Sequence, residues 1–138
     1  MVSLLFMFAA CSARHTGSSA HPEERVKQAA ADLTAGKTDF YRLTTKGDSG
    51  PGSFYVLDPE GRLLWHPIPV LIGSDFSEYG FVKYIIERKT GCIFYNDPYG
   101  YIYVFFVEIE KGNILCLTVK KTDYPGMEFQ CERAGAGF

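Results

Sequence analysis

Residues 54–76 read FYVLDPEGRLLWHPIPVLIGSDF, and their turn-forming residues indicate how the chain folds back on itself. Two apolar runs flank Asp58-Pro59-Glu60-Gly61, whose residue types are those of a type I β-turn. Asp occupies the first position, Pro sets φ at the second, and Gly accepts a positive φ at the fourth. A turn that ends in a left-handed glycine closes a three-residue hairpin loop with a bulge. The stretch therefore predicts a β-hairpin, after which residues 66–76 leave the sheet.

Length and charge limit the classes of function. The chain has 138 residues, enough for one domain with a modest core. Its formal net charge is −2, so no basic field indicates a nucleic-acid partner. Tyr and Phe residues concentrate within residues 54–106, which is typical of many short strands or of a pocket lined by aromatic rings.

The N-terminus has the pattern of an export signal. An apolar run over residues 2–10 ends in Ala9-Ala10-Cys11 and is too short to span a bilayer. The cysteine at this boundary resembles the lipobox of bacterial lipoproteins, in which that cysteine is lipidated and becomes the first mature residue. We therefore expect residues 1–21 to be a signal and tether and Cys11 to be the lipidation site. The protein would then be exported and held in the bacterial cell envelope, touching the membrane only through the lipid anchor. Cleavage without lipidation, or a chance match, are the alternatives.

The rest of the chain alternates between helical and extended patterns. One helix is predicted after Pro22 with a stop at Gly36, and a second after residue 76, with Asp75 as its N-terminal cap. Three strands follow at residues 91–96, 101–110 and 113–121, and residues 97–100 repeat the Asp-Pro-x-Gly turn. The order predicts an α+β domain: a five-stranded antiparallel sheet with an N-terminal helix and one helix between strands 2 and 3. Residues 125–138 are expected to form a loose tail.

This element order resembles a PAS-like fold, and residues 56–76 look like the Cache family of extracellular sensory domains. The shared signature is an apolar strand, D-x-x-G, a second strand, a His-Pro and a G-x-D, and the resemblance covers about residues 53–121. It implies a single Cache-like domain over residues 22–124 that binds a small molecule without catalysis and signals through a membrane receptor or signalling partner. Family members that bind small carboxylates place a Lys or Arg on the central strands, where this chain is apolar or aromatic. The ligand class therefore stays open: an uncharged or aromatic-compatible ligand, or no ligand, is an equal alternative to a small organic acid or amino acid.

Strand register supplies the candidate site residues. If the turn at residues 97–100 closes as the first one does, Tyr95 lies opposite Tyr103, and one sheet face combines aromatic rings with hydroxyl groups. The resemblance places the loop after the second strand beside the ligand cavity. The predicted ligand-binding residues are Trp65, His66, Tyr95, Tyr101, Tyr103 and Thr118. The alternative is that the tyrosines are ordinary strand formers, Trp65 belongs to the core and His66 caps a turn.

Nothing in the sequence assembles catalytic chemistry. No nucleophile elbow or phosphate-binding glycine loop occurs, so an enzyme is not expected and no cofactor is implied. No two cysteines have C-x-x-C spacing, and the histidines do not cluster with them, so no metal site is expected. The rival hypothesis is an envelope lipoprotein that serves as a structural or protein-interaction domain without a small ligand.

With Cys11 lipidated, Cys92, Cys116 and Cys131 remain. The number is odd, so at least one thiol would be free or paired between chains. The predicted register places Cys92 and Cys116 on opposite faces of the sheet, which argues against a disulfide between them.

Overall fold

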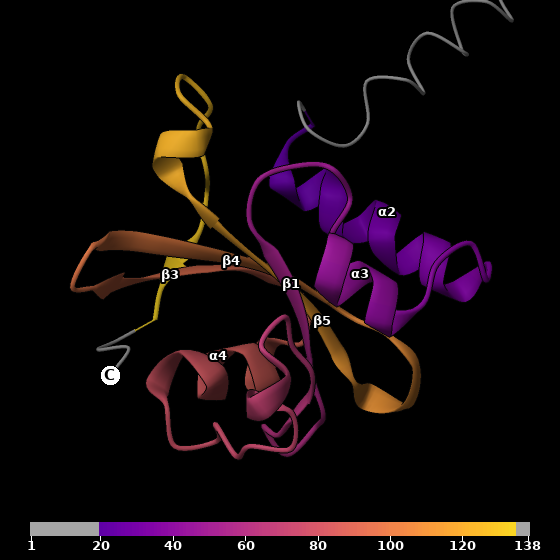
Figure 1. Cartoon of the computed structure of the whole chain (residues 1–138). Helices are drawn as coiled ribbons and strands as arrows, with labels where there is room; N and C mark the ends of the chain where they lie inside the picture. The colour runs from indigo at the N-terminus through magenta and orange to yellow at the C-terminus, as the bar shows by residue number, and fades with distance from the viewer. Residues whose placement is uncertain (1–19, 135–138) are drawn as a thin grey trace, which may run out of the picture.

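The computed structural model describes residues 20–134 (Figure 1). The predictions for Cys11, for the signal and tether up to residue 19, and for residues 135–138 lie outside this range. Every helix within this range is too short or too polar to span a bilayer.

Helix α2, Pro22–Thr34, begins as the sequence predicts. Pro22 occupies the first turn, where its missing N–H removes no helical hydrogen bond, and Glu23 and Glu24 lie at the positive end of the helix dipole. His21 caps the helix, because its Nδ1 accepts a hydrogen bond from the Glu23 N–H at 3.1 Å. A second helix, α3 at Phe40–Lys46, was not predicted. Its seven residues are too few to form a recognisable apolar period.

The sheet has six strands in the order β2-β1-β5-β4-β3-β6. The strands are β1 Ser53–Leu57, β2 Leu63–Trp65, β3 Gly91–Asp97, β4 Gly100–Glu108, β5 Ile114–Lys120 and β6 Glu132–Arg133. The first five are antiparallel to their neighbours, and β6 pairs with β3 in parallel. The α+β class is confirmed. The predicted sheet of five antiparallel strands is wrong, because a sixth strand, β6, pairs in parallel with β3.

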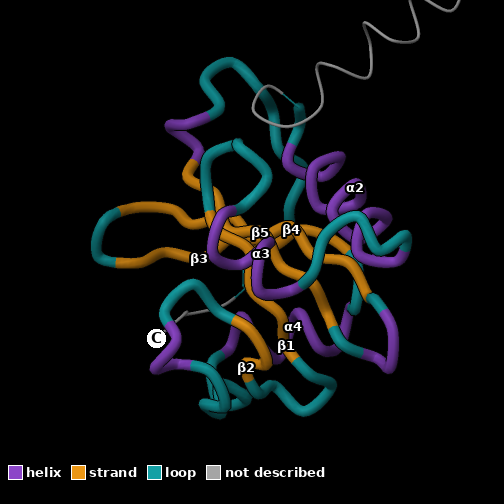
Figure 2. The backbone as a smooth tube through the Cα atoms, turned by 45° about the vertical axis from the view of Figure 1, so that its right-hand side comes forward, coloured by secondary structure: helices purple, strands orange, loops and turns teal. Residues whose placement is uncertain are grey.

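Two layers of helix cover the sheet (Figures 1 and 2). Helices α2 and α3 pack on one face, which we call the α2 face; its buried residues include Val26, Phe54 and Phe105. Helix α4, Gly80–Arg88, packs with the preceding loop on the opposite face, which we call the α4 face. Short 3-10 helices η1 Pro69–Leu71, η2 Glu110–Gly112 and η3 Lys121–Asp123 complete the chain path.

The two Asp-Pro-x-Gly turns close differently. At the first, the Asp58 N–H donates to Arg62 O at 2.9 Å and Gly61 adopts φ 93°, so the three-residue loop is confirmed. At the second, Asp97 pairs directly with Gly100, which leaves a two-residue loop. The predicted register of this hairpin is therefore wrong by one residue: Tyr95 lies opposite Ile102, and Phe94 lies opposite Tyr103.

Asp75 does not cap α4, the helix that the sequence predicts after residue 76. Its carboxylate accepts a hydrogen bond from the Ser77 N–H at 2.9 Å, within a turn that precedes α4, and the cap position of α4 is Tyr79. The residue type correctly marks a break in the chain, but the helix begins a turn later than predicted.

The C-terminal segment, which we define as residues 125–134, returns to the sheet. A disulfide joins Cys131 to Cys92 on β3, and β6 follows at once. The looseness expected of these ten residues is therefore wrong, although the division into a tether, a domain and a tail stays a prediction. Cys116 is free and buried, and it does not pair with Cys92, as predicted from their opposite faces.

Candidate ligand-binding site

The α4 face of the sheet carries hydroxyl and thiol groups inside an apolar layer. Tyr55 on β1 lies opposite Cys116 on β5, and Thr118 is two residues further along the same strand. Tyr95 reaches the same face from β3, where Ile93 pairs with Val104 and Val104 pairs with Thr118. Side chains two apart on a strand share a face, so these four groups form one polar floor. Tyr55, Cys116 and Tyr95 are only 8%, 0% and 7% exposed.

His66 stands at the edge of this floor. Its ring centroid is 5.9 Å from that of Tyr55. The Nδ1 atom accepts a hydrogen bond from the Ile68 N–H at 3.0 Å, so in the neutral ring the proton lies on Nε2. Partial burial lowers the pKa of His66, which keeps the ring neutral at pH 7.

An aromatic series covers the floor from the α4 side. Phe76 contacts Tyr79 edge-on with centroids 5.1 Å apart, and Tyr79 stacks on Phe81 at 5.9 Å. Phe81 then stacks on Tyr95 at 4.4 Å. These rings occupy the space between the sheet and α4, so a ligand that reaches the floor has to displace them.

The floor groups are held in their neutral forms. Burial raises the pKa of Tyr55 well above its usual range; Cys116 and Tyr95 raise it further, and a hydrogen bond with the Thr118 side chain opposes them. Burial, with the charge of Asp97, raises the pKa of Tyr95 to about 12. Burial likewise raises the pKa of the Cys116 thiol. Neutral hydroxyl and thiol groups donate hydrogen bonds, whereas a thiol without thiolate character is a poor nucleophile.

No buried charge faces this floor. Within residues 20–134 the only buried charged side chain is Arg25, which belongs to the α2 side of the sheet. Its guanidinium donates to both carboxylate oxygens of Asp48, at 2.9 and 2.6 Å, to Pro51 O at 2.6 Å and to the Tyr124 hydroxyl. This saturated cluster fastens α2 to the loop after α3. In the same range no group of three or more His, Cys, Asp or Glu side chains could hold a metal ion.

The structure divides the six predicted ligand-binding residues between the two faces. His66, Tyr95 and Thr118 meet on the α4 face, where Tyr55 joins them. The tyrosine face predicted from the sequence does not exist as one surface, because the second hairpin is shifted by one residue and its tyrosines fall on both sides.

The other three predicted residues lie on the α2 face. Trp65 pairs with Val56 and stacks on Phe40 of α3, with centroids 6.2 Å apart. Tyr103 stacks on Phe94 at 5.5 Å. Tyr101 is 49% exposed and lines a cleft of about 430 Å³ at the end of the β3–β4 hairpin. Whether any of the six binds a ligand stays a prediction.

Sequence reasoning missed Tyr55 as a site residue. The signal was present, because Tyr55 interrupts the apolar run of residues 54–57 with a hydroxyl group. Its importance depends on the pairing with Cys116, which joins strands sixty residues apart and cannot be read from either strand alone.

Comparisons with known proteins find only partial similarity, and only among solved structures. No protein-family model matches the chain, and no curated protein matches it. Among solved structures, an extracellular domain assigned to a histidine kinase, mmHK1S-Z2, aligns with TM-score 0.46 and 23% identity over 52% of this chain. The ligand-binding domain of Mlp24 with asparagine aligns with TM-score 0.42 and 17% identity, also over 52% of this chain. The alignments cover 32% and 29% of those chains, so this protein matches less than a third of each.

Proposed function

We propose that the protein is an exported sensory module that binds a small uncharged molecule on the α4 face without catalysis and reports its ligand state to a partner protein. We further propose that Cys11 carries a lipid that holds the module in the cell envelope. The ligand would lie against the floor of Tyr55, Tyr95, Cys116 and Thr118, with His66 at its entrance.

One observation carries this proposal: four polar side chains lie together on the floor of the otherwise apolar layer between the sheet and α4, where aliphatic side chains alone could form the core. Ligand sites are apolar pockets with a few convergent polar groups, and the floor has this composition. The raised pKa values of the floor groups suit hydrogen-bond donation and argue against a nucleophile or base at this place. The absence of a buried charge on this side, within residues 20–134, favours an uncharged ligand.

Export is supported by the Cys92–Cys131 disulfide, because disulfides form and persist mainly in oxidising compartments outside the cytosol. The lipid anchor rests on the sequence of residues 2–11. Metabolic labelling with palmitate tests it: the native chain should take up label and Cys11→Ser should not. Equal labelling of both chains would contradict the lipid anchor but would not bear on the proposed ligand site.

A thermal-shift screen of the purified chain tests the ligand. The compounds should be matched pairs, each a neutral amide or alcohol beside the corresponding carboxylate. A specific ligand at a hundred times its Kd adds about 2.7 kcal/mol to the free energy of unfolding. We expect stabilisation from neutral members and little from their acids. A preference for the acids would contradict the proposed chemistry.

A matched pair of variants locates the site. Tyr55→Phe and Tyr103→Phe each remove one hydroxyl group, the first on the α4 face and the second on the α2 face. Loss of one neutral hydrogen bond costs about 0.5–1.5 kcal/mol, which weakens binding about two- to twelve-fold. Isothermal titration should show this loss in Tyr55→Phe alone. The same loss in both variants, or in neither, would contradict a site on the α4 face.

A protein-interaction domain is the second candidate, and one observation favours it. Ile68, Val70 and Ile72 project from the loop before α4 with 53%, 83% and 42% of their surfaces exposed. Large apolar side chains gathered at a surface often mark a contact with another protein. Failure of the ligand screen, together with binding of a partner that Val70→Lys abolishes, would favour this function instead.

A further inference from the structure

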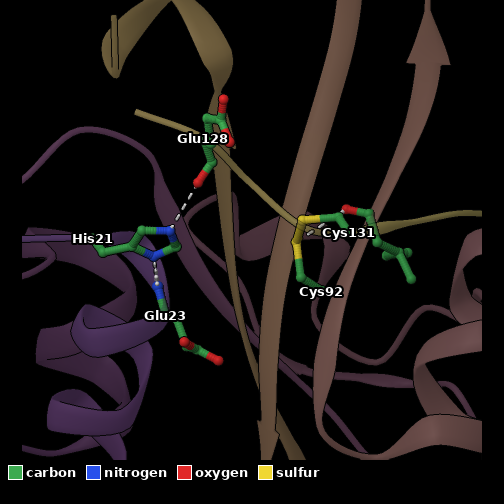
Figure 3. The surroundings of a disulfide bond; sticks show 6 residues. His21, Glu23, Cys92, Glu128 and Cys131 are labelled. Atoms are coloured by element: carbon green, nitrogen blue, oxygen red, sulfur yellow. Dashed lines mark hydrogen bonds between the residues drawn. A yellow bond between two sulfur atoms is a disulfide. The ribbon is translucent and has the colours of Figure 1, made fainter. Parts of the chain in front are cut away.

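One covalent bond attaches the C-terminal segment to the sheet. The Cys92–Cys131 disulfide joins residues 39 apart in sequence, with their Cα atoms 4.7 Å apart (Figure 3). Beyond it, β6 pairs with β3 over only two residues. One further backbone bond follows, from the Ala134 N–H to Phe94 O at 2.9 Å.

The segment covers aromatic residues of the α2 face. The Phe129 ring packs edge-on against Tyr103 and Phe105, each with centroids 5.1 Å apart. It also contacts His21 at 5.4 Å and Tyr124 at 5.7 Å. Strand β4 holds Tyr103 and Phe105, His21 caps α2, and Tyr124 accepts a hydrogen bond from Arg25. Because these partners are held without Phe129, its departure would expose them without dismantling the sheet.

The polar attachments of the segment are weak. The Arg88–Glu132 ion pair at 2.9 Å has side chains 38% and 58% exposed, and ion pairs that face water contribute little. The contact between His21 Nε2 and Glu128 O is 3.4 Å long (Figure 3). Apolar packing adds to these contacts, because Ala134 is fully buried and the Arg133 guanidinium lies over the Phe94 ring at 5.3 Å. The disulfide is the one covalent restraint on the segment within residues 20–134, and the remaining contacts are non-covalent.

The disulfide can be approached from outside. Cys92 and Cys131 are both half-buried, whereas Cys116 is fully buried. Cys92 lines two clefts: one of about 390 Å³ beside His21 and Glu128, and one of about 220 Å³ beside Arg88 and Gln130. An attacking thiolate needs access to a disulfide sulfur, and both clefts open beside Cys92.

We propose that Cys92–Cys131 is a thiol–disulfide exchange site for a protein dithiol, and that its reduction releases the C-terminal segment from the sheet. One thiolate of the dithiol attacks Sγ of Cys92, the S–S bond breaks, and its electron pair leaves on Sγ of Cys131, which takes up a proton. The second thiolate then attacks the dithiol's own sulfur in the mixed disulfide and displaces the Cys92 thiolate, which is protonated. Two electrons and two protons pass to the cysteine pair, and the dithiol becomes a disulfide.

This inference goes beyond the proposed ligand site. Phe129 and the rings that it covers belong to the α2 face, whereas the ligand floor belongs to the α4 face, where Ala134 at the end of the segment is also buried. Release of the segment would uncover aromatic surface around Phe105 and Tyr103, a change in the module that does not require the ligand.

Hydrogen–deuterium exchange of the full chain tests the proposal, with dithiothreitol as the small dithiol and reduced thioredoxin as the protein dithiol. Peptide mapping assigns the state of each cysteine in the folded protein. We expect both reagents to reduce Cys92–Cys131 without urea. The amides of residues 125–134 should then exchange at least tenfold faster, while those of residues 102–107 and 114–119 stay protected.

Two variants complete the test. Cys131→Ser should show the fast exchange of residues 125–134 without any reductant, and added dithiothreitol should not change its exchange further. Tyr99→Phe, at a side chain that is 94% exposed, should behave like the native chain before and after reduction. The proposal is overturned if the disulfide resists thioredoxin until the protein is unfolded in urea. It is equally overturned if the bond is reduced but exchange of the segment does not change, or if the whole sheet loses protection together.

Discussion

Tyr55 and Cys116 lie directly opposite each other on β1 and β5, and both side chains are buried on the α4 face. Their pairing brings a hydroxyl and a thiol together in an apolar layer. Burial disfavours the charged form of each group, and this has consequences for reactivity and for stability at high pH.

The thiol of Cys116 should be inert in the folded protein. Burial raises its pKa, and the thiolate is the reactive form, so alkylation by iodoacetamide at pH 8 should be slow. Peptide mapping should find Cys116 unmodified in the native state and modified after unfolding in urea. Rapid native labelling of Cys116 would show that this face opens readily.

Alkaline pH should destabilise the fold. The pKa of Tyr95 is raised from its ordinary value of 10.0 to about 12, and that of Tyr55 is raised too. The folded state then binds more protons than the unfolded state above pH 10, so the contribution to stability is complete below that pH and is lost as the pH rises through 12. For Tyr95 the largest possible loss is about 2.7 kcal/mol.

Urea unfolding at pH 8, 9.5 and 11 measures this dependence. Tyr95→Phe should show a shallower decline than the native chain, because it has no phenol to ionise at this position. Tyr99→Phe, in a residue that is 94% exposed, is the matched control and should decline as the native chain does.

Breaking the buried ion pair should destabilise the protein strongly. Asp48→Asn leaves the Arg25 guanidinium, whose side chain is 0% exposed, without its counter-charge. We expect a loss of about 3–5 kcal/mol in the free energy of unfolding. The exposed pair Lys27–Glu23 is the control, and Glu23→Gln should cost less than about 1 kcal/mol. Equal losses in the free energy of unfolding for the two variants, measured by chemical denaturation, would contradict the stabilising role of the buried Arg25 ion pair.

The same carboxylate should make the fold sensitive to acid. Burial alone would raise the pKa of Asp48, but its hydrogen bonds and charge interaction with Arg25 prevail, and the pKa lies below its ordinary value of 3.8. This contribution is present above pH 3.8 and is lost as the pH falls through the lower, folded-state value. Urea midpoints between pH 5 and pH 2 should therefore fall less steeply in Asp48→Asn than in the native chain.

The two turn glycines should differ in their tolerance of a side chain. Both have positive φ, 93° at Gly61 and 130° at Gly100, so alanine at either site should cost about 1–3 kcal/mol in backbone strain. A Cβ at Gly61 would also lie 2.9 Å from Cα and Cβ of Ser77, whereas one at Gly100 meets nothing within 4 Å. Gly61→Ala should therefore be the worse variant by about 1–3 kcal/mol in thermal or urea unfolding. The reverse order would contradict the close approach of the turn to Ser77.

Local chemistry in the sequence determined the first hairpin, helix α2 and the α+β class. Asp58, Pro59 and Gly61 each meet a positional demand of the turn, and Pro22 with the acidic residues after it fits a helix start. These features depend on neighbours within a few residues, so residue type and spacing suffice to predict them.

Tertiary structure alone decided which side chains meet. The same Asp-Pro-x-Gly pattern closes a three-residue loop at residues 58–61 and a two-residue loop at residues 97–100, and a shift of one residue sends the opposing side chains to the other face. For this reason Tyr95 joins Tyr55 while Tyr103 joins Phe129. The bond between Cys92 and Cys131 and the pairing of β6 with β3 likewise depend on contacts between distant segments. Phe129 packs on the α2 face, and the chain then returns to β3, a strand about forty residues earlier in the sequence.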